Sequence, residues 1–242
     1  MNPPDAWNPL REFTDARIAL GRSGASLPTR EVLNFGLAHA RARDAIHQPF
    51  ASDQLVQPLA ELGLSTLTVR SAASDRHVYL NRPDLGRQLN EESRADLAAS
   101  GARPADLLLV IGDGLSSYAV QRQAVPLIRA LLPYLKTLGL SLAPVVLAHQ
   151  SRVALGDDIG ETLKTRAVAI LIGERPGLSS PDSLGVYLTW QPHRGLSFDA
   201  AAFKLAWLLE QAFLRRLTGV RLKDESDNPA LHGKIKPLSQ LK

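Results

Sequence analysis

Residues 107–111 form a continuous run of large aliphatic side chains, Leu-Leu-Leu-Val-Ile, and Gly112-Asp113-Gly114 follows at once. A strand with one face in water would alternate apolar with polar residues. An uninterrupted run of this length therefore predicts a strand that is buried on both faces. Helices on both sides of a sheet provide such burial, so this run favours an α/β fold built on a mostly parallel sheet.

The rest of the chain after residue 104 repeats the pattern of buried strand and amphipathic helix. Further strands are expected at Val145–Leu147, Ala167–Ile172 and Leu184–Trp190, and helices at residues 117–138, 158–163 and 201–217. Strands that alternate with helices are joined by right-handed crossovers, which place the strands side by side in parallel. We therefore predict a Rossmann-like sheet with helices on both faces.

The first hundred residues have a different pattern, which predicts a mainly helical region with a small β element. A helix is expected to begin near Ser26–Thr29, where Ser or Thr can cap it and Pro28 is tolerated in the first turn. It should continue to about His47. The other elements expected here are short helical pieces at residues 48–65, strands at Thr66–Val69 and His77–Leu80, and a helix at residues 84–99.

These patterns divide the chain into four segments. They are an N-terminal arm at residues 1–15, the helical region with its small β element at 16–103, the Rossmann-like domain at 104–224, and a polar C-terminal tail at 225–242. We expect the domain at 104–224 to hold the binding site.

Composition excludes several classes of protein. With no cysteine among 242 residues there can be no disulfide, zinc ribbon or iron–sulfur cluster. No apolar run approaches the roughly 20 residues of a membrane-spanning helix, and no secretory signal pattern opens the chain, so neither a membrane nor export is expected. A net charge of +4 fits a solvated surface better than nucleic-acid binding. We expect a cytoplasmic protein.

Ligands of parallel α/β sheets bind outside the carboxyl ends of the strands, where the strand order reverses. This rule selects the loops at residues 112–117, 148–156 and 173–183. In the first loop, Gly112-x-Gly114 resembles the start of a dinucleotide fingerprint, but Ser117 stands where Gly or Ala should follow. The alternatives are a tight turn, with Asp113 and Ser116 capping the next helix, and a loop that lines another large cofactor.

The charged residues of the other loops also allow two interpretations. Glu174 could accept hydrogen bonds from amide or ribose groups while Arg175 orients it or meets a phosphate, or the two could form a local ion pair. Asp157 and Asp158 are expected to complement the dipole of a helix. The six histidines show no spacing typical of a metal site, and His149 is notable only for its place at a strand end.

Several motifs together resemble one family, the small subunit of adenosylcobalamin-dependent ethanolamine ammonia-lyase. The resemblance covers residues 16–224, in the order of that family. It is carried by Arg17–Glu31, Leu80–Arg87, Ile111–Ser116, Asp158–Glu161 and Gly173–Gly185.

The resemblance implies a subunit that holds a cofactor and has no catalytic residue or metal ligand of its own. In this family the large subunit carries the substrate pocket, and adenosylcobalamin lies between the two subunits of the heteromer. The cofactor supplies the radical chemistry that converts ethanolamine to acetaldehyde and ammonia. The family's cobalamin contacts correspond here to Val153 and Glu174.

One departure from the family pattern is substantial. The family has a third contact, a cysteine in a Cys-Ile-Ser-Asn motif between the last strand and the closing helix, but here Gln191–Gly195 runs directly into Leu196. In addition, Ser151 replaces a glycine before Arg152. The alternative is therefore a structural docking subunit with weakened or lost cobalamin binding. The N-terminal arm has no evident amphipathic helix for targeting to a bacterial microcompartment, so the cytoplasm remains the expected location.

Overall fold

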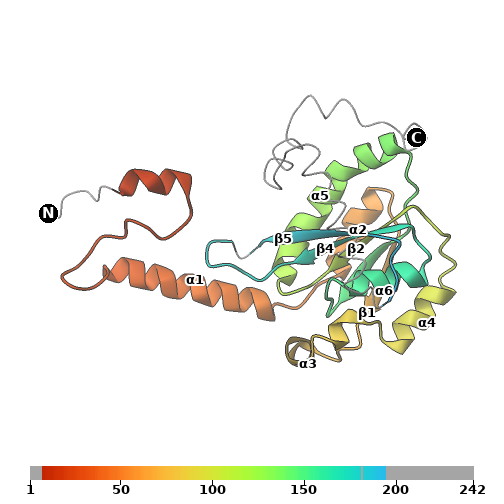
Figure 1. Ribbon diagram of the computed structural model, residues 1–242, viewed down its shortest axis with the longest axis horizontal. Coiled ribbons are helices and arrows are strands. Elements are labelled where there is room, and N and C mark those ends of the chain that lie inside the picture. Colours follow the sequence, from red (N-terminus) through yellow and green to blue (C-terminus); the bar gives the residue numbers. More distant parts are fainter. Residues whose placement is uncertain (1–6, 181, 195–242) are drawn as a thin grey trace, which may run out of the picture.

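The computed structural model describes residues 7–180 and 182–194, and its centre is one five-stranded sheet in the order β1-β3-β2-β4-β5 (Figure 1). The strands are β1 (Thr66–Arg70), β2 (Leu107–Gly112), β3 (Val145–His149), β4 (Ala167–Gly173) and β5 (Leu184–Trp190). The first four are parallel, and β5 pairs antiparallel with β4. The predicted α/β class with a mostly parallel sheet is confirmed.

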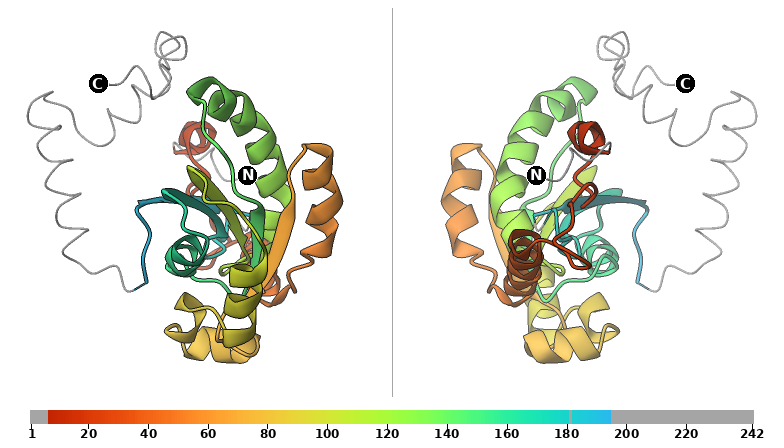
Figure 2. Two further views of the ribbon diagram at one scale, coloured as in Figure 1. Left: turned by 90° about the vertical axis from the view of Figure 1, so that its right-hand side faces the viewer. Right: turned by 90° about the vertical axis from the view of Figure 1, so that its left-hand side faces the viewer.

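Helices cover both faces of the sheet, as the apolar run at residues 107–111 predicts (Figure 2). On one face, α2 (Asp53–Glu61) and α5 (Ser117–Leu138) pack against alternate β2 residues such as Leu109. On the other face, α4 (Glu91–Ala99) and α6 (Leu155–Thr162) pack against the intervening residues such as Leu108. Both leucines are fully buried, so β2 is the shared wall of two hydrophobic cores.

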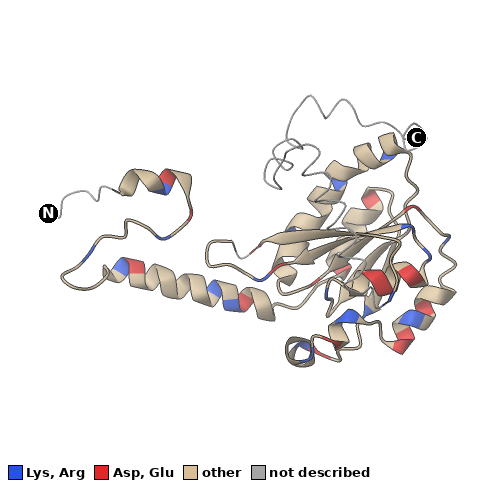
Figure 3. Ribbon diagram, in the orientation of Figure 1, with Lys and Arg blue, Asp and Glu red and all other residues tan. Residues whose placement is uncertain are grey.

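The charged residues are distributed according to burial. Strands β2 to β5 contain no Lys, Arg, Asp or Glu, and the charged residues of the described chain lie on helices and loops, apart from Arg70 at the end of β1 (Figure 3). Within the part of the chain that the structure describes, no helix has both the length and the apolar character to cross a membrane.

The N-terminal segment extends away from the sheet (Figure 1). It consists of a short 3-10 helix, η1 (Asn8–Phe13), and the long helix α1 (Thr29–His47), in which Ala45 is the buried residue. The expected extent of α1 is confirmed. The expected cap is wrong, because Pro28 occupies the N-cap position and no side chain caps the helix.

Two expectations for the region before β2 are wrong. Residues His77–Leu80 do not form a strand but lie in helix α3 (Arg76–Asn81). The Asp75 side chain accepts a hydrogen bond from the Val78 N–H, and this cap starts a helix despite the β-branched content. The single helix expected at 84–99 is divided into η2 (Leu85–Arg87) and α4, because Asn90 caps a new helix.

Two smaller differences concern the start of α6 and the place of β1. Helix α6 begins at Leu155, three residues before the expected start at Asp158. Strand β1, expected as a small β element of the N-terminal region, pairs with β3 at one edge of the main sheet. The closing helix expected at residues 201–217 lies outside the described residues.

Candidate functional site

The strand order reverses around β2. From β2 the chain moves to β3 on one side, and from β3 it crosses to β4 on the other, so the carboxyl ends of these three strands share one edge of the sheet. The loops that follow them contact one another: the Leu115 N–H donates to the Gly173 carbonyl at 2.8 Å, and Asp113 accepts from the Ser151 N–H. The structure thus brings together the three loops that the sheet rule selects.

Asp113 joins the first two loops. Its carboxylate accepts from the backbone N–H groups of Gln150, at 2.9 Å, and Ser151, at 2.8 Å, and only 3% of the residue is exposed. Burial raises the pKa of Asp113 to about 6, although the two N–H groups and nearby Arg76 act in the opposite direction. The expected cap is therefore half correct: Ser116 caps α5, whereas Asp113 holds the neighbouring loop.

The two glycines at the sheet edge allow close approach between backbones. A Cβ at Gly114 would collide with the Gly173 carbonyl, and a Cβ at Gly173 would collide with the Ser116 carbonyl. Gly114 also has a φ of +55°, which favours glycine. Because the chain's own β4 fills the space beside Gly114, the Gly-x-Gly sequence serves a tight turn that packs directly on β4.

Glu174 follows β4 directly and is half-buried. Its Oε1 accepts a hydrogen bond from the Tyr187 hydroxyl at 2.5 Å, and its N–H donates to the Ser183 carbonyl. Gly185 makes room for that carboxylate, since a Cβ there would collide with Oε1. Among the described residues, Oε2 has no hydrogen-bond partner and no ion pair joins Glu174 to exposed Arg175. The ion pair that the sequence also allowed is not formed.

Val153 lies on the loop between β3 and α6, with 36% of the residue exposed. Strands β3 and β4 flank β2, so their ends are separated by two strand spacings, about 10 Å. The loops that carry Val153 and Glu174 therefore lie on either side of the end of β2. An apolar surface and an acceptor oxygen are therefore available on two loops at the same edge of the sheet.

Helix α3 adds residues that the sequence analysis missed. The Tyr79 ring lies within cation–π distance of two guanidinium groups, 4.8 Å from Arg76 and 4.3 Å from Arg152. Tyr79 is fully buried, and its hydroxyl donates to the Ser151 carbonyl at 3.0 Å. The incorrect strand at residues 77–80 hid this cluster. Asp75, a favoured capping residue three positions before Val78, was the signal that could have revealed the helix.

The remaining candidates have structural partners. His149 is half-buried with its Nε2 2.8 Å from the Ser52 hydroxyl, and burial lowers the pKa of its imidazole. Asp158 does not face solvent at a helix end; it is fully buried and pairs with Arg94 at 2.6 Å. Within residues 7–180 and 182–194, no group of three His, Cys, Asp or Glu side chains could hold a metal ion.

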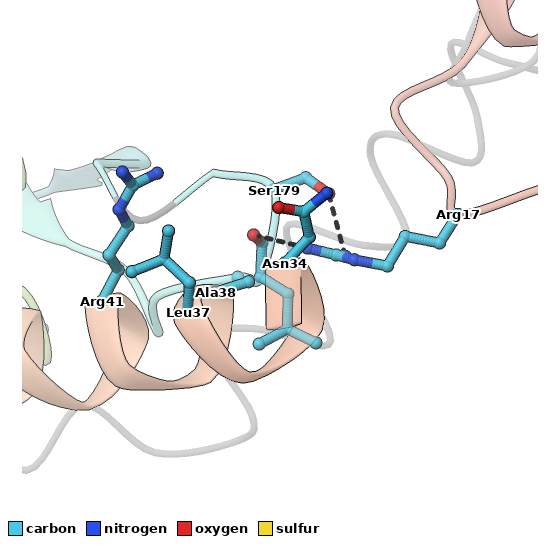
Figure 4. A pocket seen from close by; sticks show the side chains of 8 residues that line it. Arg17, Asn34, Leu37, Ala38, Arg41 and Ser179 are labelled. Carbon is cyan, nitrogen blue, oxygen red and sulfur yellow. Dashed lines mark hydrogen bonds between the residues drawn. The ribbon is translucent and has the colours of Figure 1, made fainter. Parts of the chain in front are cut away.

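A pocket lies between α1 and the loop that joins β4 to β5 (Figure 4). Its volume is about 240 Å³. Arg17 reaches across to the tip of that loop, where its guanidinium donates to the Leu178 carbonyl at 3.1 Å and to the Ser179 hydroxyl at 3.5 Å. The N-terminal segment is thereby connected to the same loop that carries Glu174.

The sheet and its edge loops define an α/β protein with a mostly parallel, Rossmann-like sheet, a class in which ligands bind at the carboxyl ends of the strands. Residues 4–223 match the family model described as ethanolamine ammonia-lyase light chain (EutC). This chain belongs to that family.

Three relatives, each called ethanolamine ammonia-lyase small subunit, show the extent of the similarity. The protein of Xanthomonas campestris pv. campestris is 50% identical over 95% of this chain and 91% of its own length. That of Bradyrhizobium diazoefficiens is 53% identical over 91% of both chains. That of Pseudomonas paraeruginosa is 49% identical over 95% of this chain and 93% of its own.

This chain lacks counterparts for some residues of a relative. The match to the Pseudomonas relative runs over 254 positions, although it covers only 95% of a chain of 242 residues. The relative therefore has residues without a counterpart in this chain.

Proposed function

We propose that this chain is the cofactor-holding small subunit of an ethanolamine ammonia-lyase, assembled with a large catalytic subunit. In this proposal Val153 and Glu174 contact adenosylcobalamin at the crevice between the two subunits. The observation that carries the proposal is the position of Glu174 in a chain of this family: it stands at the carboxyl end of β4 with one carboxylate oxygen free of partners among the described residues.

The side chains at the crevice fit such a cofactor. The periphery of cobalamin presents amide groups and apolar surface, and the free Oε2 of Glu174 can accept from an amide N–H. Tyr187 holds the other oxygen and so fixes the carboxylate orientation. The exposed part of Val153 offers an apolar contact that excludes water. When bound, adenosylcobalamin supplies the radical chemistry for conversion of ethanolamine to acetaldehyde and ammonia.

The second candidate is a docking subunit that assembles with the large subunit but has weakened or lost cobalamin binding. Three observations favour it: the absence of the Cys-containing motif before Leu196, the absence of any cysteine, and the residues of the relatives that have no counterpart here. Removal of one wall of a crevice would expose the cofactor and reduce its affinity.

Titration of the purified complex with adenosylcobalamin distinguishes the two candidates. The chain is co-expressed with its large subunit, and binding is followed by visible absorbance. Saturable, stoichiometric binding supports the cofactor-holding subunit, whereas co-purification without binding supports the docking subunit. Failure of the two chains to co-purify would contradict both.

Substitution of Glu174 tests the assigned contact. A hydrogen bond to a charged acceptor contributes about 1.5–3 kcal/mol, so Glu174→Ala should weaken cobalamin binding at least tenfold without loss of the complex. Glu92→Gln, an exposed change on α4, is the matched control and should leave affinity unchanged. Unaltered affinity in Glu174→Ala would refute the contact.

A further inference from the structure

The loop that carries Val153 is fastened by three separate parts of the chain. Asp113, after β2, accepts from the N–H groups of Gln150 and Ser151. Tyr79, on α3, donates its hydroxyl to the Ser151 carbonyl. In addition, the Arg152 N–H donates to the Gly86 carbonyl at 2.8 Å. Every residue from 150 to 152 is therefore held immediately before Val153.

The backbone conformation of this loop is intrinsically unfavourable. Gln150 has a φ of +55°, in the left-handed region that is unfavourable for residues other than glycine. Its side-chain Oε1 is buried and has no hydrogen-bond partner among the residues that the structure describes. The loop therefore needs an external group to hold it in this form, and the carboxylate of Asp113 occupies the position that does so.

We infer that Asp113 is a positioning residue for the cofactor crevice, whose carboxylate holds the Gln150–Ser151 backbone and thereby sets the place of Val153. The effect of Asp113 on cobalamin affinity rests on the proposed function. Asp113 itself has no contact with the cofactor in this scheme. It acts through the loop, and only the ionised form has two acceptor oxygens for the two N–H groups.

The groups that face Asp113 make its ionisation sensitive to ordinary pH. Arg76 of α3 lies 3.8 Å from its carboxylate, and the ring of buried Tyr79 lies within cation–π distance of both Arg76 and Arg152. Burial raises the pKa of Asp113 to about 6, which the opposing hydrogen bonds and Arg76 only partly offset. Below that pH the protonated carboxyl turns an O–H toward a backbone N–H, and one of the two fastening bonds is lost.

Backbone hydrogen exchange tests the inference without any cofactor. In the complex of this chain with its large subunit, Asp113→Asn should accelerate exchange at Gln150 and Ser151 at least tenfold. In the unsubstituted chain, protection of these amides should fall as the pH decreases through about 6, after correction for intrinsic exchange rates. Unchanged exchange in Asp113→Asn would overturn the inference.

Cobalamin titration provides the second readout. Asp113→Asn should weaken binding at least tenfold at pH 7 and remove the pH dependence of affinity between pH 5 and 7.5. The control is Asp106→Asn, because Asp106 lies just before the opposite end of β2 and accepts from the Ser141 N–H at 3.0 Å and from Arg166. An equal loss in the control would mean general destabilisation and overturn the inference.

These outcomes separate the inference from the proposed function. If the complex binds no cobalamin, the proposed function fails, whereas the exchange at Gln150 and Ser151 still decides the role of Asp113. If cobalamin binds with the same affinity and pH profile in Asp113→Asn, the proposed function stands and the positioning role is refuted.

Discussion

Replacement of Asp158 by asparagine tests whether this carboxylate holds two layers of the fold together or only complements the dipole of α6. Asp158 is fully buried, and its Oδ2 accepts from the Leu89 N–H at 2.8 Å and from the Arg94 guanidinium at 2.6 Å. These bonds attach α4 and the segment before it to α6. The matched control is Glu91, an exposed carboxylate in the first turn of α4.

The magnitudes expected for the two substitutions differ clearly. Breaking a buried ion pair from one side costs about 3–5 kcal/mol, but the Arg94 side chain is 35% exposed and can recover water, so we expect about 2–3 kcal/mol for Asp158→Asn. Loss of an exposed charge that only complements a helix dipole costs about 0.3–1 kcal/mol, which is our expectation for Glu91→Gln. At roughly 2–4 °C per kcal/mol, Asp158→Asn should lower Tm by about 5–10 °C.

The assay is urea unfolding of the full chain at pH 7, followed by circular dichroism. A double-mutant cycle with Arg94→Met isolates the interaction between the two side chains, which should amount to about 1–2 kcal/mol. Equal losses for Glu91→Gln and Asp158→Asn would refute the reasoning. Strict additivity of Asp158→Asn and Arg94→Met would refute it as well.

Two further predictions concern the sheet and the pH dependence of stability. Leu147→Ala, at a fully buried position on β3, should cost about 3 kcal/mol in urea unfolding, whereas Leu188→Ala, 71% exposed on β5, should cost less than about 0.5 kcal/mol; equal losses would contradict the assigned burial. Because burial raises the pKa of Asp113 from 3.8 to about 6, the folded chain retains a proton that the unfolded chain has lost between these values. The contribution of Asp113 to the free energy of unfolding should therefore decrease as pH rises from about 4 to 6 and stay constant above. Measurement at pH 4.5, 5.5 and 7 should show this slope in the unsubstituted chain and its loss in Asp113→Asn; the same slope in both would refute the assignment.

The candidate site could be predicted in outline because its position depends on local patterns. Three buried strands and the polar loops after them are visible in the sequence, and parallel strands bring those loops to one edge. Glu174 and Val153 lie on two of these loops. The residues that surround Glu174 could not be predicted, because Tyr187 and Gly185 belong to an antiparallel strand whose register places them beside it.

The cluster around Tyr79 shows most clearly where prediction from local sequence patterns fails. Residues 77–80 have a strand-like composition, yet the cap at Asp75 and the burial of the Tyr79 ring against Arg152 stabilise a helix. The cap is local, but Arg152 and Ser151, which contact Tyr79, lie 73 and 72 residues away along the chain. Intrinsic propensity is weak and tertiary burial overrides it.

The amino-acid sequence predicts the α/β class, the buried strands β2, β3 and β4, the long helices α1 and α5, and the three loops at one edge of the sheet. Each of these depends on hydrophobic periodicity or on turn chemistry over a few adjacent residues. The sequence does not predict that β1 joins the sheet beside β3, that β5 runs antiparallel, or that Asp113 holds the loop before Val153, because these features arise from tertiary contacts. Strand order and buried hydrogen bonds join residues distant in sequence, and the energy that selects them arises when those residues pack together.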